Sequence, residues 1–402
     1  MVAIPRQCDV IVVGAGPAGA AAAITLARDG RTVHVFDKAR FPRDKCCGDG
    51  LTTLGLRELE RLGFDPATVP GWFPVDSAVL RSPSGREVRV PLVGDGTFAA
   101  TAPRRELDAA LVQLARDRGA HVHEGWAFTG FADDGSLTFT DEATTVDVQA
   151  TRVIAADGMW SPVRKALGAA IPDYRGEWHA FRQYACNVTG PAARDLIVWF
   201  EPDLLPGYAW SFPLPDGRAN VGFGVLRDGV RSVRDMGALW RDLLARPHIV
   251  AALGAGFELE GRHTAWPIPA RVDSIPLVHG RVLFVGDAAA ATDVLTGEGI
   301  GQALETGRLA AEAIIDGGDV GDAYRRSVRR HLFADHRMSR RLGRVLAHER
   351  GARGALRIVS LSGAWGRRNF ARWMFEDEPR AIALTPRRWH RGLLSRPGTY
   401  TG

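Results

Sequence analysis

The chain has 402 residues, of which 46% are hydrophobic and 24% are charged, and its 51 basic and 46 acidic side chains give a formal net charge of +5. This composition is typical of a globular protein with two or three packed units, and it excludes a disordered or fibrous protein. No apolar run reaches the roughly 18 residues that a membrane-spanning helix needs, so the sequence does not predict an integral membrane protein.

The start of the chain and its cysteines indicate a cytoplasmic protein. Residues 1–16 lead directly into a strand-like segment, and no basic region followed by a cleavage site of small residues precedes that segment. The four cysteines are too few for a disulfide framework; they are Cys8, Cys46, Cys47 and Cys186. We therefore expect reduced thiols and a location in the cytoplasm.

Arginines gather near the C-terminus, chiefly between Tyr324 and Arg353. Two interpretations of this region are open. It is either a solvated helical face or a peripheral contact with the anionic inner face of a membrane, where each arginine would contribute about 1 kcal/mol. No nucleic-acid recognition motif accompanies the positive charge, so we expect no nucleic-acid partner.

A complete β-α-β unit opens the chain. The sequence predicts a buried strand over residues 8–13, a helix over 18–28 and a second strand over 32–36 that ends at Asp37. A Gly-x-Gly-x-x-Gly sequence joins the first strand to the helix, where it permits a tight turn and brings a pyrophosphate close to the helix N-terminus. An acidic residue after the second strand is placed to bind a ribose hydroxyl. We assign a dinucleotide to Gly14, Gly16, Pro17, Ala18, Gly19 and Asp37.

Three further segments favour FAD as that dinucleotide. One is the Ala-Asp-Gly sequence 156–158, followed by Ser161 and Arg164, which is typical of flavoproteins. The predicted strand 281–285 ends in a Gly-Asp pair, where flavoproteins place an aspartate on the ribityl chain, and a glycine-rich segment then opens the helix 300–315. The positive end of that helix would face the flavin pyrimidine ring. Residues 254–256 lack the third glycine of a second dinucleotide fingerprint. The cofactor positions assigned on this basis are Asp157, Gly158, Gly286, Asp287, Gly297, Gly299 and Ile300.

The order of the elements predicts an α/β fold with a discontinuous Rossmann-type FAD-binding domain. The segment between about 171 and 269 has long alternating strand patterns, and the part after 320 is helical. We expect residues 1–75, 100–170 and 270–320 to form the FAD-binding domain, 76–99 and 171–269 an antiparallel, β-rich substrate domain, and 321–402 a C-terminal helical region.

Four blocks between residue 8 and about residue 315 carry a resemblance to a known family. They are the Cys-Gly-Asp-Gly segment in 41–52, Arg-x-x-Leu-Asp in 104–108, YxWxFP with GxG in 208–224, and 286–300. These blocks resemble the geranylgeranyl reductase family of the para-hydroxybenzoate hydroxylase-type flavoproteins. The resemblance implies further cofactor contacts by Arg43, Gly48, Asp49, Gly50 and Arg104, and we also assign Lys38 and Phe128 to the cofactor site. Ala290 and Val294 replace a glycine and a proline that are usual in the family, and Asp293 is an unusual neighbour of the flavin.

Aromatic residues alternate along the segment 208–212, so their side chains should share one face of a strand. Two interpretations are open. The face either belongs to an aromatic core or forms the wall of an apolar pocket over the isoalloxazine ring, suited to a prenyl chain. The residues assigned to the lining of the substrate site are Cys47, Tyr208, Trp210, Phe212 and Phe223.

Cys47 lies in the glycine-rich loop between Cys46 and Gly50. It is either a buried small apolar residue or a group that shapes the site at flavin N5 and relays a proton to carbon. Tyr208 and an ordered water are the other candidates for the proton donor. A disulfide between the adjacent cysteines would be strained, so we expect none.

The histidines and cysteines do not predict a metal site. His121 and His123 have strand spacing but no further ligands nearby, so we expect them to be surface residues. Four cysteines, two of them adjacent and none after Cys186, cannot supply a Cys₄ iron–sulfur cluster. This excludes a quinone-linked electron-transfer-flavoprotein dehydrogenase.

Together with the resemblance, these features predict an FAD-dependent oxidoreductase. It would transfer hydride from reduced flavin to carbon–carbon double bonds of a hydrophobic, isoprenoid or prenyl substrate, with NAD(P)H or a small electron carrier as the electron donor. The alternatives are an FAD-dependent monooxygenase on a hydrophobic or aromatic substrate, a flavin-dependent halogenase and a non-enzymatic FAD carrier. A halogenase would need a WxWxIP sequence and a catalytic lysine, and none of Lys38, Lys45 and Lys165 is an evident candidate.

Overall fold

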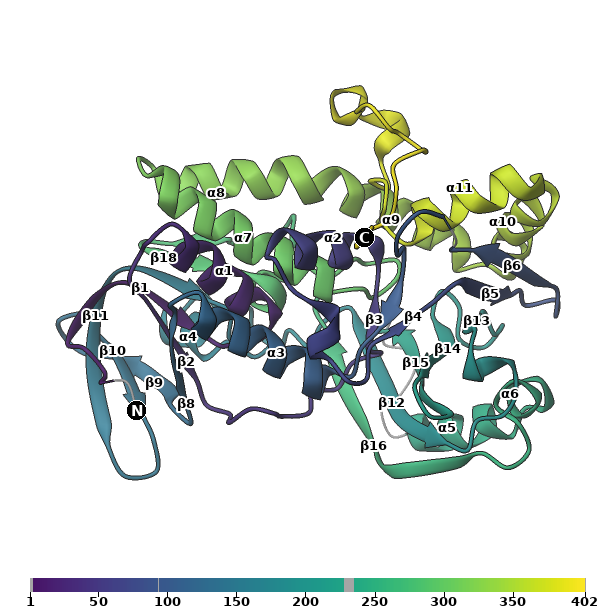
Figure 1. Cartoon of the computed structure of the whole chain (residues 1–402), viewed down its shortest axis with the longest axis horizontal. Coiled ribbons are helices and arrows are strands. Elements are labelled where there is room, and N and C mark those ends of the chain that lie inside the picture. The colour runs from purple at the N-terminus through teal and green to yellow at the C-terminus, as the bar shows by residue number, and fades with distance from the viewer. Residues whose placement is uncertain (1–2, 93, 228–234, 402) are drawn as a thin grey trace.

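The computed structural model describes residues 3–92, 94–227 and 235–401. Two large sheets lie at opposite ends of the molecule, and the C-terminal helices run along one side of both (Figure 1). The predicted α/β class, with a helical C-terminal region, is confirmed.

The first sheet carries the dinucleotide-binding unit. The five strands β18, β11, β1, β2 and β8 run parallel to one another. A parallel sheet is covered on both faces, which explains why the chain begins with a continuous apolar run. In spatial order the strands are β17 (Val278–His279), β18 (Val282–Phe284), β11 (Thr145–Ala155), β1 (Gln7–Val13), β2 (Val33–Asp37) and β8 (His121–Glu124), and β10 (Leu137–Thr140) with β9 (Ala127–Phe131) extends β11.

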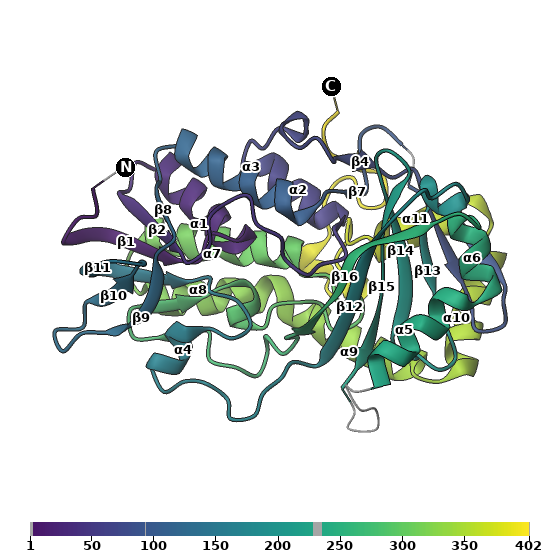
Figure 2. The same cartoon turned by 90° about the horizontal axis from the view of Figure 1, so that it is seen from below.

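Helix α1 lies at the centre of the packing around this sheet. It contacts both α3 and α7, and its run of buried alanines lets those helices approach closely (Figure 2). The helical segments of this part of the chain are α1 (Pro17–Arg28), α2 (Thr53–Arg61), η1 (Pro66–Thr68), α3 (Arg104–Asp117), α4 (Pro162–Ala166), η4 (Gly286–Ala289) and α7 (Ile300–Asp316).

The second sheet is mainly antiparallel and has a helix-covered face. Phe181, Phe223 and Trp240 form the core between that face and α5. The strands in order are β16 (Glu258–Ile268), β12 (Trp178–Cys186), β15 (Arg218–Leu226), β14 (Tyr208–Leu214), β13 (Leu196–Trp199), β5 (Ser77–Arg81) and β6 (Glu87–Pro91), and the helical segments are η2 (Pro191–Ala193), α5 (Met236–Ala245) and α6 (Pro247–Leu253).

The joining of β5 and β6 to strands from a later part of the chain supports the domain boundaries given above, which we retain as a proposal. A third, small sheet connects the two large ones. It contains β3 (Gly50–Leu51), β7 (Ala100–Thr101) and β4 (Phe73–Pro74).

The C-terminal region returns to the body of the protein instead of extending away from it. Helices α10 and α11 pack on β6, and Leu356 and Val359 join the core there. Thr399 then forms an isolated bridge with Thr97. The helical segments are α8 (Val320–Val328), η5 (Arg329–Phe333), α9 (Ala334–Leu346), α10 (Glu349–Leu361), α11 (Gly363–Met374), η6 (Ile382–Leu384) and η7 (Pro386–Arg388). Among the described residues, no helix has the length and apolar character that crossing a membrane requires.

Candidate active site

The glycine loop lies between β1 and α1, where the sequence predicts it. Gly14 has a φ of +99°, and a Cβ there would lie 2.4 Å from the Ala156 carbonyl oxygen, so only glycine fits. A Cβ on Gly16 would meet only the Arg43 guanidinium, at 3.7 Å, which leaves space in front of this residue. Within the described ranges, no side chain caps α1 and no acidic residue lies in its first turn. The loop and the helix N-terminus therefore fit a pyrophosphate.

Asp37 is fixed beside this loop at the end of β2. Its Oδ2 accepts a hydrogen bond from the Ala15 amide at 2.7 Å, and its Oδ1 accepts one from the Ala39 amide at 2.8 Å. A carboxylate has about four acceptor positions, so both oxygens can still accept hydrogen bonds from ribose hydroxyls. The observed position therefore fits the adenosine end of FAD.

Two arginines converge near the entrance of the loop. Arg104 makes a bidentate pair with Asp108, with distances of 2.7 and 2.8 Å, and the Arg43 Nη1 lies 3.0 Å from the same carboxylate. Two guanidinium groups therefore share one carboxylate. The remaining positive charge suits a phosphate group, so we retain both arginines as proposed cofactor contacts.

Asp49 joins the Cys-Gly-Asp-Gly loop to the second sheet. It is fully buried with a left-handed φ of +63°, and its Oδ2 accepts hydrogen bonds from the Tyr184 phenol at 2.7 Å and from Asn220 Nδ2 at 2.8 Å. The Arg104 amide approaches its Oδ1 at 3.2 Å. Burial raises the pKa of Asp49, and the two side-chain donors oppose that rise. We therefore assign Asp49 the role of holding this loop, whose neighbours Gly48 and Gly50 remain proposed cofactor contacts.

Cys47 lies in the same loop as a half-buried, neutral thiol. Its Sγ accepts a hydrogen bond from the Asp49 amide at 3.4 Å. Burial raises the pKa of Cys47 to about 11, although Arg104 acts in the opposite direction. At neutral pH the group therefore keeps its proton, which fits a shaping or proton-donating role better than a nucleophilic one.

Three of the predicted wall residues share one face of β14. The Tyr208 and Trp210 rings lie 6.0 Å apart, and the Trp210 and Phe212 rings lie 5.9 Å apart. The Phe212 ring packs against the loop, where a Cβ on Gly48 or Gly50 would meet it at 3.1 Å. The wall and the Cys47 loop are therefore in direct contact at this point.

Phe223 does not belong to this wall. It pairs with Ala209 in the β14–β15 ladder and points to the opposite face, where it packs on Phe181 and Trp240 in the helix-covered core. Gly222, which pairs with Trp210, occupies the wall side of β15. Strand residues alternate between faces, so a shift of one position separates lining from core.

The loop before α7 brings a carboxyl group to the helix N-terminus. Gly297 has a φ of +70°, and Glu298 Oε1 accepts a hydrogen bond from the Ile300 amide at 2.9 Å. Burial raises the pKa of Glu298 to about 7. We retain Gly297, Gly299 and Ile300 as proposed flavin contacts, with Glu298 as an additional neighbour.

The other two flavoprotein-like segments lie at the ends of neighbouring strands. Asp157 accepts hydrogen bonds from Ser161 Oγ at 2.7 Å and from the Val163 amide at 2.9 Å, and so caps α4. Asp287, in η4 after β18, is half-buried. Ala290 has a φ of +48°, a conformation that favours the glycine usual in the family.

For two proposed cofactor residues, the surroundings give no direct support to a cofactor contact. Lys38 is exposed. Phe128 is buried, with its ring 5.2 Å from Phe131 and 5.9 Å from Phe139, so its clearest contacts are within an aromatic cluster. Both remain proposals.

The prediction that His123 is a surface residue is wrong. Its side chain is buried, and its Nε2 lies 2.9 Å from His34 Nδ1 on the neighbouring strand. His121 lies beside this pair, with its ring 4.6 Å from that of His34. No group of three or more candidate metal ligands occurs within the part of the chain that the structure describes.

Sequence analysis missed two parts of the site. The Lys45 ammonium lies 3.4 Å from the centre of the Trp266 ring, and burial lowers its pKa to about 8 while Asp287 opposes that change. The second part is the segment 372–381, which carries the buried residues Asp377 and Arg380. Its signal in the sequence is an acidic triplet within a region otherwise rich in arginine.

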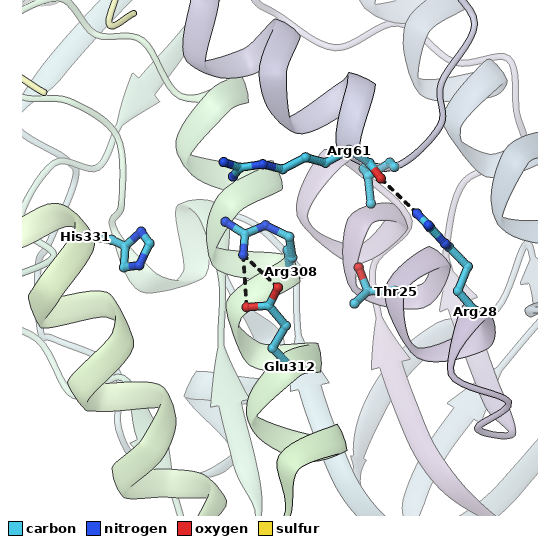
Figure 3. A pocket seen from close by; sticks show the side chains of 7 residues that line it. Thr25, Arg28, Arg61, Arg308, Glu312 and His331 are labelled. Atoms are coloured by element: carbon cyan, nitrogen blue, oxygen red, sulfur yellow. Dashed lines mark hydrogen bonds and ion pairs between the residues drawn. The ribbon is translucent and has the colours of Figure 1, made fainter. Parts of the chain in front are cut away.

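Two hollows lie away from the aromatic wall. The first, of about 470 Å³, is lined by Thr25, Arg28, Arg61, Leu62, Arg308, Glu312 and His331 (Figure 3). Its cations already have partners: Arg28 donates to the Arg61 carbonyl at 2.8 Å and Arg308 pairs with Glu312 at 2.8 Å. The second, of about 220 Å³, adjoins Asp287 and the α4 cap. Neither hollow is lined by Tyr208, Trp210 or Phe212.

Comparisons with known proteins agree with this geometry. The FAD binding domain family matches residues 7–198. The chain is 34% identical over 367 residues to the menaquinone reductase of Mycolicibacterium smegmatis, covering 85% of each chain. It is 32% identical over 321 residues to digeranylgeranylglycerophospholipid reductase 1 of Methanopyrus kandleri, covering 77% of this chain and 81% of that protein.

Solved structures share the fold at lower identity. A geranylgeranyl bacteriochlorophyll reductase-like protein from Thermoplasma acidophilum superposes with a TM-score of 0.79 at 22% identity, covering 95% of this chain and 99% of the other. A flavin-dependent brominase gives a TM-score of 0.68 at 18% identity, covering 94% and 92%. These two similarities establish the architecture only, since it occurs with both reduction and halogenation.

Proposed function

Since the chain belongs to the geranylgeranyl reductase family of FAD-dependent oxidoreductases, we propose how its own residues bind and reduce a prenyl substrate. The observation that carries the proposal is the aromatic wall of Tyr208, Trp210 and Phe212, which faces the loop of Cys47. Bound FAD supplies the hydride for reduction of a carbon–carbon double bond.

The residues of the first sheet have binding roles. The loop from Gly14 to Gly19 and the N-terminus of α1 hold the pyrophosphate, and Asp37 holds the ribose. Arg43 and Arg104 balance phosphate charge beside Asp108. These groups would hold and orient the cofactor, and the Cys47 loop and the N-terminus of α7 are the parts of the chain that we propose to contact its flavin ring.

The residues of the second sheet and its loop have roles toward the substrate. The aromatic wall suits a hydrophobic isoprenoid chain, because flat apolar side chains bury such a chain without offering unpaired polar groups. Reduction of an isolated double bond also needs a proton, for which the neutral thiol of Cys47 and the phenol of Tyr208 remain candidates. Cys47 is a weak acid at neutral pH, and the Tyr208 phenol already donates to the Thr296 carbonyl.

The electron donor that we propose is NAD(P)H or a small electron carrier. The test of the proposed function is anaerobic reoxidation of the reduced flavoprotein by a prenyl lipid. Menaquinone and a digeranylgeranylglycerophospholipid are the probes, in detergent micelles. Reoxidation without oxygen and a product whose prenyl chain is heavier by two hydrogens per reduced bond are the expected results, since reduction of the quinone ring alone would add its two hydrogens outside that chain. A product that gains oxygen and forms only in air would make the protein a monooxygenase, and a halogenated product would make it a halogenase.

We also propose that the protein works at the inner surface of an anionic membrane. Between residues 340 and 396 the chain has 14 arginines and four acidic residues, whereas the whole chain has a net charge of only +5. Large apolar side chains are exposed in the same region, including Ile358 and Leu361, each 71% exposed, and Trp365, 73% exposed. Arginines beside exposed tryptophan and aliphatic groups fit the interface of an anionic bilayer, where prenyl lipids reside.

A further inference from the structure

The segment from Arg372 to Ala381 is built into the site formed by the earlier parts of the chain. The Thr53 amide donates to the Phe375 carbonyl at 2.8 Å, directly after the Cys-Gly-Asp-Gly block. The Arg57 guanidinium, from α2, pairs with the buried carboxylate of Asp377. The C-terminal region therefore contributes side chains to the interior of the reduction site as well as to the surface.

Glu376 is the residue of this segment that reaches both the Cys-Gly-Asp-Gly block and helix α7. Its Oε2 accepts a hydrogen bond from Thr52 Oγ1 at 3.1 Å, and its Oε1 accepts one from Gln302 Nε2 at 2.9 Å. Its φ is +59°, a conformation that non-glycine residues rarely adopt and that a surrounding structure must maintain. The backbone is thus held in a strained form that places this carboxyl group between α2 and α7.

Thr52 gives a second, independent indication. It occupies the N-cap position of α2, where threonine hydroxyls usually accept a hydrogen bond from the helix backbone. Here, in the described part of the chain, its side chain makes no cap hydrogen bond and is turned to Glu376 instead. The Thr52 hydroxyl therefore contacts the Glu376 carboxyl group and does not cap helix α2.

The charges around Glu376 do not balance if every group is ionised. Among the described residues, this cluster contains the carboxyl groups of Asp293, Glu298 and Glu376 and one guanidinium, that of Arg380. His336 also faces Asp293, but burial lowers its pKa and favours its neutral form. Burying charge without a partner is expensive, so a cluster with three acids and one base retains protons on some of the acids. Asp335 also faces Arg380, but it is paired with Arg388 at 2.8 Å.

Asp293 is the acid of this cluster that stays ionised. One oxygen accepts from the amides of Leu295 and Thr296 at 3.0 and 2.8 Å, and the other accepts from Ser339 Oγ at 2.6 Å and faces Arg380 at 3.3 Å. These donors and Arg380 hold the pKa of Asp293 below its usual value despite its burial.

Glu376 is the acid best placed to stay protonated. Glu298 has a backbone N–H donor at the α7 N-terminus, which favours its charged form. Glu376 has neutral donors, and Arg380 approaches it only at 3.4 Å while it also faces Asp293. Burial, together with Asp293 and Glu298, raises the pKa of Glu376 to about 8, although Arg380 and Thr52 oppose the rise.

We propose that Glu376, delivered by the C-terminal segment, is a positioning residue that holds the proton for double-bond reduction and passes it through the hydroxyl of Thr52. This inference rests on the proposed function. Two hydrogens are added across the double bond: a hydride, supplied from the reduced cofactor, forms a C–H bond to one carbon, and a proton forms a C–H bond to the other. When Glu376 is protonated, its Oε2–H donates to Thr52 Oγ1 across 3.1 Å, the reverse of the direction for the ionised carboxylate. The Thr52 hydroxyl gives its own proton to carbon and takes up the proton from Glu376. The Glu376 carboxylate left behind takes a proton from water.

Three variants test the inference: Glu376→Gln, Thr52→Val and a control, Glu378→Gln. Glutamine keeps the size of Glu376 but cannot release a proton. Glu378 is a buried carboxyl on the same segment that accepts hydrogen bonds from His390 and the Leu394 amide and lies 3.9 Å from Arg372, so its loss controls for a general disturbance of the segment. Each variant is loaded with FAD and reduced, and anaerobic single-turnover reoxidation by menaquinone and by digeranylgeranylglycerophospholipid is followed against pH.

We expect Glu376→Gln to slow reoxidation by about 100-fold or more, the usual size of a lost proton-transfer group. The wild-type rate should fall as pH rises through about 8, and this dependence should disappear in Glu376→Gln but persist in Glu378→Gln. Thr52→Val should slow the step while leaving the stability of α2 almost unchanged. A Glu376→Gln rate within twofold of wild type, with the same pH profile, would overturn the inference.

An infrared measurement separates this inference from the proposed function, because it needs no substrate. We expect the band of protonated carboxylic acids to contain a component that is lost as pH rises through about 8, beside the component of Glu298, whose pKa is about 7. The first component should be absent from Glu376→Gln and retained in Glu378→Gln. Loss of this component from Glu376→Gln would support the inference that Glu376 holds a proton, even if neither prenyl lipid reoxidises the wild-type protein. Failure of both lipids would refute only the proposed function. An identical band in wild type and Glu376→Gln would show that Glu376 does not hold this proton.

Discussion

The phenol of Tyr184 donates a hydrogen bond to Oδ2 of Asp49 across 2.7 Å. This contact joins β12 of the second sheet to the loop that carries Cys47, and Asn220 of β15 donates to the same oxygen. The position of the loop, and hence of the thiol, therefore depends on a buried carboxylate in a left-handed conformation.

Replacement of Asp49 should show how much its two hydrogen bonds and its left-handed backbone conformation each contribute to stability. Asp49→Ala leaves the Tyr184 and Asn220 donors unpaired, at about 1–3 kcal/mol each, and adds roughly 1–2 kcal/mol for the left-handed backbone. Asp49→Asn tolerates that backbone and keeps one acceptor oxygen. We expect Asp49→Ala to lower the free energy of unfolding in urea by about 3–5 kcal/mol and Asp49→Asn by roughly 1–2 kcal/mol. Equal losses of unfolding free energy in Asp49→Ala and Asp49→Asn would show that the hydrogen bonds and the backbone conformation do not contribute as described.

The space in front of Gly16 predicts a variant that folds but binds FAD weakly. A methyl group there would meet only the mobile end of Arg43 in the protein, yet it would occupy the approach of the pyrophosphate. We expect Gly16→Ala to weaken FAD binding by at least about tenfold, roughly 1.4 kcal/mol, with little change in the unfolding curve of the FAD-free protein. Fluorescence titration of that protein with FAD gives the affinity. Gly256→Ala, a glycine with an open surrounding and an ordinary φ, is the control and should bind FAD like wild type.

Cys47 should react slowly with alkylating reagents at neutral pH. Burial raises the pKa of Cys47 to about 11 from an ordinary thiol value of 9.0. Near pH 7.5 its thiolate fraction is therefore about 100-fold lower than that of an ordinary thiol. Iodoacetamide labelling, mapped by mass spectrometry, should be slow at pH 7.5 and should accelerate steadily toward pH 10. Rapid labelling of Cys47 at neutral pH, faster than that of glutathione, would show an activated thiolate instead.

The part of the site that sequence analysis predicted is the part formed by neighbours along the chain. The glycine loop, Asp37 and the strand that carries Tyr208 each depend on one turn or one strand period, so their geometry follows from local rules. Phe223 was misplaced because the face it occupies depends on the register of β15 against β14, which no local pattern fixes. His123 was misplaced because its burial depends on a partner 89 residues away, His34.

The C-terminal contribution was missed for a related reason. Glu376 meets Thr52 across 324 residues and Gln302 across 74, and both contacts arise from the return of the chain over α2 and α7. A glutamate among arginines looks like a surface residue in the sequence. Only the tertiary structure shows that it is buried among other acids.

The exposed apolar residues of α10 and α11 predict binding to anionic vesicles. Replacing Ile358, Leu361 and Trp365 together by serine removes surface side chains and should leave stability within about 1 kcal/mol. We expect wild type to sediment with phosphatidylglycerol-rich vesicles, less with phosphatidylcholine vesicles and less at high salt, and the triple variant to bind at least about tenfold more weakly. Leu259→Ser, an exposed apolar position on β16, is the control. Equal binding by wild type and the triple variant would place the membrane contact elsewhere or exclude it.

The buried pair of His34 and His123 predicts a loss of stability in mild acid. Burial, with the neighbouring histidine charges, lowers the pKa of each to about 4, whereas an unfolded histidine titrates near 6.5. Between these values the unfolded chain binds more protons than the native protein, so stability rises with pH and is lost as pH falls from about 6.5 to 4. Each histidine contributes at most about 1.4 kcal/mol per pH unit in that window. Urea unfolding at pH 7.5 and pH 5 should show this decline, and the double replacement His34→Asn with His123→Asn should reduce it even if the variant is less stable at pH 7.5. A pH dependence unchanged in the double variant would assign the acid sensitivity to other groups.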